Sequence, residues 1–210
     1  MPGPAAAAAA GYTVRSARQP EDNLNTAIIT GASVGIGSAA ARAFVDEGFN
    51  VFNLSRRQCP VEGVTNIACD LSDAASVGAA CEQLRGPVEQ SSSVALVHNA
   101  SQMLKDSADH CASNDLRQVL ETNVIGLNSL NQHLLSLLPA TSSVLYVGST
   151  LSEKAVGGSF SYVVTHLPAD RVSGDSWRIG RYSGAVVNHH HRPRSYNQLR
   201  QRALIPPDPD

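Results

Sequence analysis

The sequence predicts an α/β fold in which a doubly wound parallel sheet carries helices on both faces. Short apolar runs alternate with stretches of helical periodicity between residues 25 and 148. The run at 93–100, SVALVHNA, has almost no polar alternation, which is typical of a strand buried on both faces. Right-handed crossovers between such strands then fix the doubly wound topology.

The first strand and the first helix frame a glycine-spaced turn. NTAIIT at 25–30 predicts a strand, and a helix is expected at 36–47. The turn between them reads TGASVGIG and contains Gly31, Gly35 and Gly37. Glycines permit a tight turn and a close approach of phosphate to the backbone, and the helix that follows directs unpaired amides at the anion. The alternative is a purely structural turn, but its place between strand and helix favours a phosphate site.

The remaining elements continue the alternation. NVFNLS at 50–55 and VTNIACD at 64–70 predict strands, followed by a helix at 73–84 that begins at Ser72 or Asp73. After the strand at 93–100, a leucine-rich stripe predicts a long helix at 114–138 with Ser113 or Asn114 as its N-cap. We interpret the stripe as core packing. SSVLYVGS at 142–149 is the fifth predicted strand.

Charged side chains at the end of the second strand bear on the choice of coenzyme. This strand ends in Ser55-Arg56-Arg57. An acidic residue at this place would bind the free ribose hydroxyls of NAD, whereas a small residue followed by arginines suits the 2′-phosphate of NADP. Two solvated surface arginines are the alternative. The sequence thus favours NADP, with NAD still possible.

The length and composition favour one globular domain. The chain has 210 residues, is 42% hydrophobic and has a net charge of -2. A near-neutral charge gives no reason to expect nucleic acid or an anionic membrane as a partner, and no apolar run reaches the ~20 residues that span a bilayer. The four cysteines show no C-x-x-C spacing, so we expect them to be reduced, structural and cytoplasmic, with no metal site.

Both ends of the chain differ in composition from the middle. Residues 1–24 are alanine-rich and predict a disordered leader, with a short organelle transit peptide as the alternative. Residues 166–210 carry 7 basic and 4 acidic side chains, whereas residues 1–165 carry 9 and 14. We could assign no strand or amphipathic helix to this tail, and we expect it to be irregular. Its composition leads to the hypothesis of a shifted reading frame or unspliced sequence, so that the fold is truncated on its C-terminal side.

Several motifs together resemble one enzyme family. TGASVGIG, CDL at 69–71, HNAS at 98–101, Asn123, Ser149 and Tyr162 are similar to the short-chain dehydrogenase/reductase family over residues 25–165. The resemblance implies a Rossmann-type domain over 25–165 that binds NAD(P), although His98 and Ser101 vary the usual Asn-Asn-Ala-Gly. The residues expected to contact the coenzyme are Gly31, Ser33, Gly35, Ile36, Gly37, Arg56, Asp70, Leu71, Asn99 and Ala100.

The same resemblance implies a set of catalytic residues. Tyr162 would exchange a proton with the substrate oxygen, Ser149 would hydrogen-bond that oxygen, and Asn123 would hold a helix kink and a water in the proton path. The family places a lysine four residues after the tyrosine, and His166 stands there in this chain. Free tyrosine titrates near pH ~10 and needs a neighbouring cation to act at neutral pH. An imidazole with a pKa near ~6.5 is mostly uncharged there.

Three functional hypotheses follow. The first is an NADP(H)-dependent oxidoreductase that acts on a small carbonyl or alcohol and, as is usual in the family, forms a homo-oligomer. The second is a dinucleotide-binding protein without catalysis, because His166 replaces the lysine and the second half of the family pattern is not legible in 166–210. The third is a truncated product that does not fold stably, because its sheet would end at an uncovered edge strand.

Overall fold

The computed structural model describes residues 24–152, 156–166, 177–179 and 182–187. The predicted leader, apart from Leu24, lies outside these residues. So do Pro168, the run of histidines at 189–191 and most of the predicted irregular tail. All statements below concern the described residues.

The centre of the structure is one twisted sheet with the strand order β3-β2-β1-β4-β5-β7-β6. The pairs β3–β2, β2–β1, β1–β4 and β4–β5 are all parallel. The chain therefore builds outward from β1 in one direction and then crosses back to add β4 on the other side, which confirms the doubly wound α/β fold. The strands are β1 (Asn25–Thr30), β2 (Asn50–Ser55), β3 (Val64–Ala68), β4 (Ser93–His98), β5 (Ser143–Val147), β6 (Trp177–Ile179) and β7 (Tyr182–Val187).

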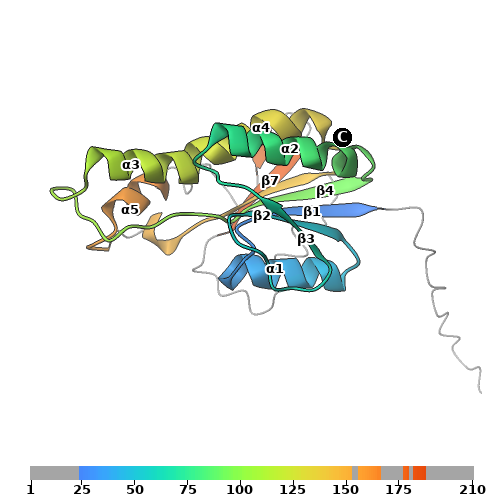
Figure 1. Ribbon diagram of the computed structural model, residues 1–210, viewed down its shortest axis with the longest axis horizontal. Coiled ribbons are helices and arrows are strands. Elements are labelled where there is room, and N and C mark those ends of the chain that lie inside the picture. Colours follow the sequence, from blue (N-terminus) through green and yellow to red (C-terminus); the bar gives the residue numbers. More distant parts are fainter. Residues whose placement is uncertain (1–23, 153–155, 167–176, 180–181, 188–210) are drawn as a thin grey trace, which may run out of the picture.

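Helices cover both faces of the sheet, with α1 on one side and α2 and α4 on the other (Figure 1). Apolar side chains of β1 alternate between the two faces: Ile28 packs in the cluster beneath α2 and α4, and Ile29 in the cluster beneath α1. Each fully buried aliphatic side chain contributes about 1.5–3 kcal/mol relative to an exposed one. The helices are α1 (Gly35–Asp46), α2 (Ala74–Glu89), α3 (Ser113–Leu120), the π-helical segment η1 (Glu121–Ile125), α4 (Gly126–Leu134), the 3-10 segments η2 (Leu135–Leu137) and η3 (Thr150–Ser152), and α5 (Phe160–His166).

Two strands lie in the tail for which we predicted no regular structure. β7 pairs in parallel with β5, with Val144 opposite Gly184, and β6 pairs antiparallel with β7. The prediction of an irregular tail is therefore wrong at 177–179 and 182–187, and β5 is not an edge strand. The longest apolar run of this tail is only AVV, too short for us to recognise a strand. Backbone pairing with β5 supplies the order that the sequence pattern does not indicate.

Helix boundaries show where local sequence was informative. Asp73 is the N-cap of α2, and its side chain accepts a hydrogen bond from the Ala75 amide at 2.9 Å. The predicted helix at 114–138 is real but divided, because η1 separates α3 from α4. The N-cap of α3 is Ala112, not Ser113 or Asn114. Within the part of the chain that is described, no helix has the length and apolar character needed to cross a membrane.

Candidate functional site

The glycine turn after β1 has the backbone that the sequence predicts. Gly31 and Gly35 have positive φ angles of 72° and 60°, which side chains rarely adopt. A Cβ at Gly35 would meet no atom within 4 Å, so this glycine faces open space. A Cβ at Gly37 would overlap the Asn99 amide nitrogen and the Gly31 carbonyl oxygen. The turn therefore leaves space for a ligand beside Gly35, whereas it is closely packed against the protein at Gly37.

A hydrogen-bonded joint fastens this turn to the end of β4. The Thr30 hydroxyl accepts bonds from the backbone amides of Asn99 and Ala100, both at 3.0 Å. In return, the Asn99 side-chain amide donates to the carbonyl oxygens of Thr30 at 3.1 Å and Gly31 at 3.0 Å. Because these bonds join β1 to β4 at the point where the strand order reverses, they fix the floor of the crevice in which open α/β sheets bind ligands.

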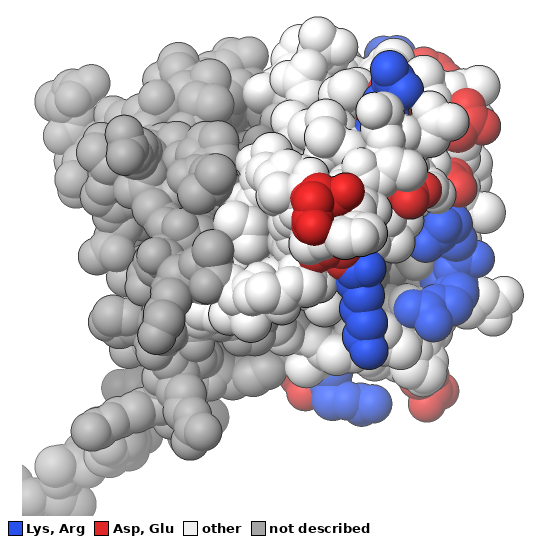
Figure 2. Space-filling model, turned by 90° about the vertical axis from the view of Figure 1, so that its left-hand side faces the viewer, with Lys and Arg blue, Asp and Glu red and all other residues white. Residues whose placement is uncertain are grey.

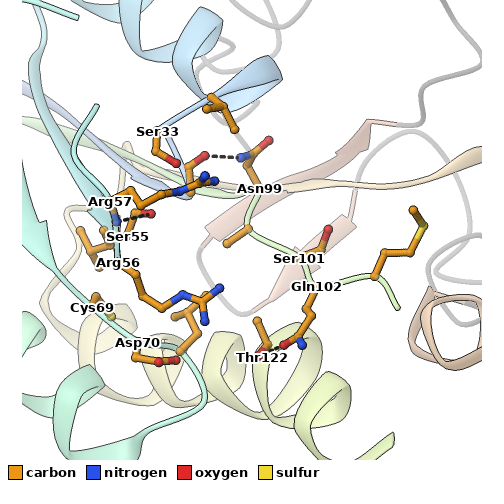
Figure 3. Close-up of a pocket in the computed structure, with 16 residues that line it drawn as sticks. Ser33, Ser55, Arg56, Arg57, Cys69, Asp70, Asn99, Ser101, Gln102 and Thr122 are labelled. Atoms are coloured by element: carbon orange, nitrogen blue, oxygen red, sulfur yellow. Dashed lines mark hydrogen bonds between the residues drawn. The ribbon is translucent and has the colours of Figure 1, made fainter. Parts of the chain in front are cut away.

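A cavity of about 420 Å³ opens at the carboxyl ends of β1, β2, β3 and β4. Seven of the ten residues expected to contact a coenzyme line it, all except Gly35, Ile36 and Gly37. The lining residues are Gly31, Ser33, Val34, Leu54, Ser55, Arg56, Arg57, Cys69, Asp70, Leu71, Asn99, Ala100, Ser101, Gln102, Met103 and Thr122. Residues from four separate loops therefore share one cavity (Figure 3).

Charged groups in the cavity come from the loops after β2 and β3. Figure 3 shows the side chains of Arg56 and Arg57 extending into the cavity, with Asp70 on the side of Arg56. Hydrogen bonds from the Ser72 hydroxyl at 2.7 Å and amide at 3.0 Å lower the pKa of Asp70, and the Arg56 guanidinium acts in the same direction. Burial opposes this shift. Asp70 is therefore ionised at neutral pH beside an arginine.

The surface around this end of the molecule carries mixed charge. Figure 2, which shows the side that lies at the left in Figure 1, places basic and acidic side chains close to one another over the described residues. Opposite charges in such proximity largely cancel at a distance, and salt screens what remains. Recognition of an anion at this site would therefore depend on the local groups of the cavity.

Asn123 connects the cavity to the helix that carries Tyr162. It lies in η1 and is 8% exposed. Its side-chain oxygen accepts a hydrogen bond from the Gln102 backbone amide at 2.7 Å, and its side-chain nitrogen donates to the Gln102 carbonyl oxygen at 3.0 Å. Its side-chain amide also donates to the Thr165 hydroxyl at 3.0 Å. A π-helical turn widens the backbone and is frequent at functional sites. Here it lets one buried side chain hold both the wall of the cavity and α5.

Tyr162 and His166 lie one turn apart on α5 and contact each other through their rings. The ring centroids are 4.0 Å apart and the planes are inclined by 22°, so the imidazole stacks on the phenol. His166 Nδ1 lies 2.9 Å from the Tyr162 carbonyl oxygen and 3.0 Å from the Thr165 hydroxyl. Burial lowers the pKa of His166, partly offset by its bond to that carbonyl. The side chain at the lysine position is therefore neutral and stacked.

Ser149 follows β5 and precedes η3. It is 8% exposed, and its hydroxyl accepts a hydrogen bond from the Leu151 amide at 3.2 Å. η3 packs against α5, so the segments that carry Ser149 and Tyr162 are neighbours. The described residues that line the cavity do not include Asn123, Ser149, Tyr162 or His166. Asn123 joins α5, which carries Tyr162 and His166, to the cavity wall at Gln102.

Sequence reasoning missed several residues that shape the cavity. Thr30 holds the turn, and Gln102 and Thr122 contribute side chains to the wall, joined by a 3.2 Å hydrogen bond. Asn53 is fully buried within β2. The signal that was available for Asn53 is a polar residue inside an apolar strand, because buried amides need partners. In the described portion, no group of three His, Cys, Asp or Glu residues is arranged to hold a metal ion.

Comparison with known proteins agrees with the fold and the turn. A family model described as short chain dehydrogenase matches residues 25–165. Because this match covers more than half of the chain, the protein belongs to the short-chain dehydrogenase family of oxidoreductases. A crystal structure of a short-chain dehydrogenase/reductase from Burkholderia vietnamiensis superposes with a TM-score of 0.67 at 23% identity, covering 84% of this chain and 88% of that one.

Relatives with assigned activities match the same region. Serine 3-dehydrogenase of Agrobacterium fabrum (strain C58 / ATCC 33970) is 30% identical over 68% of this chain and 55% of its own length. The NADPH-dependent 3-dehydrocapnine reductase of Ornithobacterium rhinotracheale is 29% identical over 63% of this chain and 50% of its own length. The chain therefore spans about half the length of the curated relatives it matches.

Proposed function

We propose that this chain is an NADP(H)-dependent oxidoreductase that acts on a small carbonyl or alcohol substrate. The observation that carries the proposal is the cavity in which the glycine turn, the two arginines after β2 and Asn99 come together. The first-turn amides of α1 have no partners within the helix and suit a pyrophosphate. Arg56 and Arg57 suit an additional phosphate on the adenine ribose.

The residues present fit a nicotinamide dinucleotide. Gly35 faces open space at the turn, where a bound phosphate would contact the backbone. Asp70 and Leu71 line the part of the cavity assigned to the adenine, and Asn99 and Ala100 the part that continues toward Asn123. The coenzyme, when bound, supplies the hydride that is exchanged with the substrate carbon. The phenol of Tyr162 would exchange the proton with the substrate oxygen, and the Ser149 hydroxyl would orient that oxygen.

A second candidate function is coenzyme binding without turnover. It is favoured by the neutral, stacked side chain of His166, since no cation stands at this position to stabilise a phenolate on Tyr162. A phenol whose pKa stays ~2–3 units too high loses ~10²–10³ in reactive population. Such a protein would still bind the dinucleotide, because the binding cavity does not include His166.

Turnover separates the two candidates. Purified protein is mixed with NADPH and a panel of aldehydes and ketones, and the oxidation of NADPH is followed by its absorbance. If the chain is an enzyme, we expect substrate-dependent oxidation that falls by at least ~100-fold in Tyr162→Phe, because the proton donor is removed. Binding of NADPH without oxidation of any substrate would instead support the second candidate.

Location and assembly belong to the same proposal. Cys59, Cys69, Cys81 and Cys111 are free in the structure, which supports a reducing, cytoplasmic setting. Val124 and Ile125 are 42% and 49% exposed on adjacent positions of η1. Exposed apolar side chains of this kind support the homo-oligomer that is usual in the family. Size-exclusion chromatography with light scattering tests this assembly.

A further inference from the structure

A buried amide in β2 joins two parts of the cavity. Asn53 is 0% exposed, yet each of its polar groups has a partner. Its side-chain oxygen accepts a hydrogen bond from the Ala32 amide at 2.9 Å. Its side-chain nitrogen donates to the Arg57 carbonyl oxygen at 3.1 Å and to the Asn66 side-chain oxygen at 2.8 Å. One side chain therefore spans the glycine turn and the arginine loop.

Asn66 of β3 completes this connection from the other side of the arginine loop. Its side-chain oxygen accepts a second hydrogen bond, from the Cys59 amide, at 2.7 Å. Because the amides of Ala32 and Cys59 can only donate, the side-chain oxygens of Asn53 and Asn66 must face them, which fixes the orientation of both. The Asn53–Asn66 pair thus holds the loop by hydrogen bonds at two positions, the Arg57 carbonyl oxygen and the Cys59 amide.

The two parts that the Asn53–Asn66 pair connects serve different phosphates under the function proposed above. Ala32 lies between Gly31 and Ser33 in the turn that would hold the pyrophosphate. Arg56 and Arg57 lie on the loop that would hold the 2′-phosphate. Their exposed side chains make no ion pair with an acid at 4.0 Å or less among the described residues, so the backbone of the loop determines where they stand. The pair therefore sets the separation between the two anion-binding groups.

We propose that Asn66, which holds the arginine loop at Cys59, is a positioning residue that determines the preference of this chain for NADP(H) over NAD(H), and this inference rests on the proposed function. Neither side chain is among the described residues that line the cavity. If Asn66 is removed, Asn53 keeps its bonds to Ala32 and Arg57, so the glycine turn stays in place. The loop loses its hold at Cys59. The loss of Asn66 should therefore weaken binding of the 2′-phosphate and leave binding of the pyrophosphate unchanged.

The expected size follows from the hydrogen bonds that are lost. Two bonds to the Asn66 oxygen disappear, and one net hydrogen bond contributes enough to change an equilibrium by roughly 3- to 10-fold. We expect Asn66→Ala to weaken NADPH binding by roughly 5- to 10-fold and to leave NADH binding within about 2-fold. Asn66 is exposed, so the substitution leaves no cavity in the core.

The experiment measures both affinities in the full chain. NADPH and NADH are titrated by fluorescence, and adenosine 2′,5′-bisphosphate and 5′-AMP are titrated by calorimetry, because these two probes report on the adenine end alone. Asn66→Ser, whose hydroxyl is too short to reach the same donors, must give the same shift as Asn66→Ala. Thr65→Ala is the matched control: Thr65 is an exposed neighbour on β3 and takes no part in the Asn53–Asn66 pair. Arg56→Ala shows the full loss of a phosphate contact.

The outcomes distinguish this inference from the proposed function. A selective loss of NADPH and of the bisphosphate in both Asn66 variants, with Thr65→Ala unchanged, supports it. An equal loss of both coenzymes, or an unchanged ratio, overturns it even when the wild-type chain prefers NADPH, because a purely structural role would lower both affinities together. A wild-type chain that binds both coenzymes equally also overturns it. A wild-type chain that binds neither contradicts the proposed function itself.

Discussion

At the scale of single residues, we propose that the side chain four positions after Tyr162 decides whether this site can catalyse a reaction. His166 is neutral because burial lowers its pKa, and its ring lies flat on the phenol it would have to activate. Its Nδ1 is directed to the Tyr162 carbonyl and not to the phenol oxygen. A lysine ammonium at this position would supply the missing positive charge, and its long side chain would extend beyond the backbone.

His166→Lys should therefore raise turnover of the chain. We expect NADPH oxidation at pH 7 to increase by at least ~10-fold with the best substrate of the panel, because a nearby cation stabilises the phenolate of Tyr162. The gain should vanish in the double variant that also carries Tyr162→Phe. His110→Lys, which adds the same charge at an exposed loop position, is the matched control. Equal rates for His166→Lys and the wild-type chain would show that this position does not limit the reaction.

At the scale of elements, β4, α4 and β5 are joined by a buried polar chain. His98 is 2% exposed and its Nε2 lies 2.9 Å from the Asn131 side-chain oxygen, while the Asn131 amide donates to the Tyr146 hydroxyl at 2.6 Å. The rings of His98 and Tyr146 also contact, with centroids 4.5 Å apart. His98 Nδ1 is buried without a hydrogen-bond partner among the described residues. This histidine must therefore stay neutral in the folded state.

The pH dependence of stability should reveal this histidine. Burial lowers the pKa of His98 from 6.5 to about 4. The unfolded chain thus takes up a proton below pH ~6.5 that the folded chain refuses until pH ~4, so stability is present above this window and is lost as the pH falls through it. The loss amounts to about 3 kcal/mol in the free energy of unfolding.

Denaturant unfolding between pH 7 and pH 4 measures this loss. We expect His98→Asn to give a flatter profile than the wild-type chain, because asparagine does not titrate. The carboxylates whose pKa is lowered, such as Asp70, act in the same direction and remain in both proteins. His133→Asn, on the exposed face of α4, is the matched control for the loss of an imidazole. Parallel profiles for His98→Asn and the wild-type chain would exclude His98 as the source.

Elements also show how far the sequence could be used for prediction. β1 and β2 have the predicted bounds, because their apolar runs end at clear turn signals. α2 continues beyond the predicted end at residue 84 through Gly86 and Pro87 to Glu89. The proline stays inside because packing of Leu84 and Val88 against the sheet outweighs the lost hydrogen bond. η1 was not predictable as a π-helix, since its geometry depends on the tertiary contacts of Asn123.

The candidate site was predictable where particular residue types, such as glycine, indicate the backbone conformation. Glycines that need positive φ angles identify the turn, and seven predicted coenzyme residues line the cavity. The connections that hold these residues together were not predictable. Asn53, Asn66 and Thr30 act through partners that are distant in sequence, and a single sequence does not show which strands become neighbours.

At the scale of the whole molecule, the sheet extends further beyond β5 than the sequence of the tail indicated. β7 covers the edge of β5, and the cavity proposed to bind a dinucleotide lies on the opposite half of the sheet, at the ends of β1, β2, β3 and β4. The described residues that line the cavity, and those that hold its walls through the hydrogen bonds given above, lie within residues 30–123. Coenzyme binding should therefore be a property of the chain whether or not the chemistry of Tyr162 is intact.

Isothermal titration calorimetry of the folded chain with NADPH and with NADH tests this claim most directly. The proposed phosphate-binding turn beside two arginines predicts saturable one-site binding of both coenzymes, with NADPH the tighter ligand. The absence of heat with either coenzyme, from protein that melts cooperatively, would show that the loops after β1 and β2 do not form a dinucleotide site.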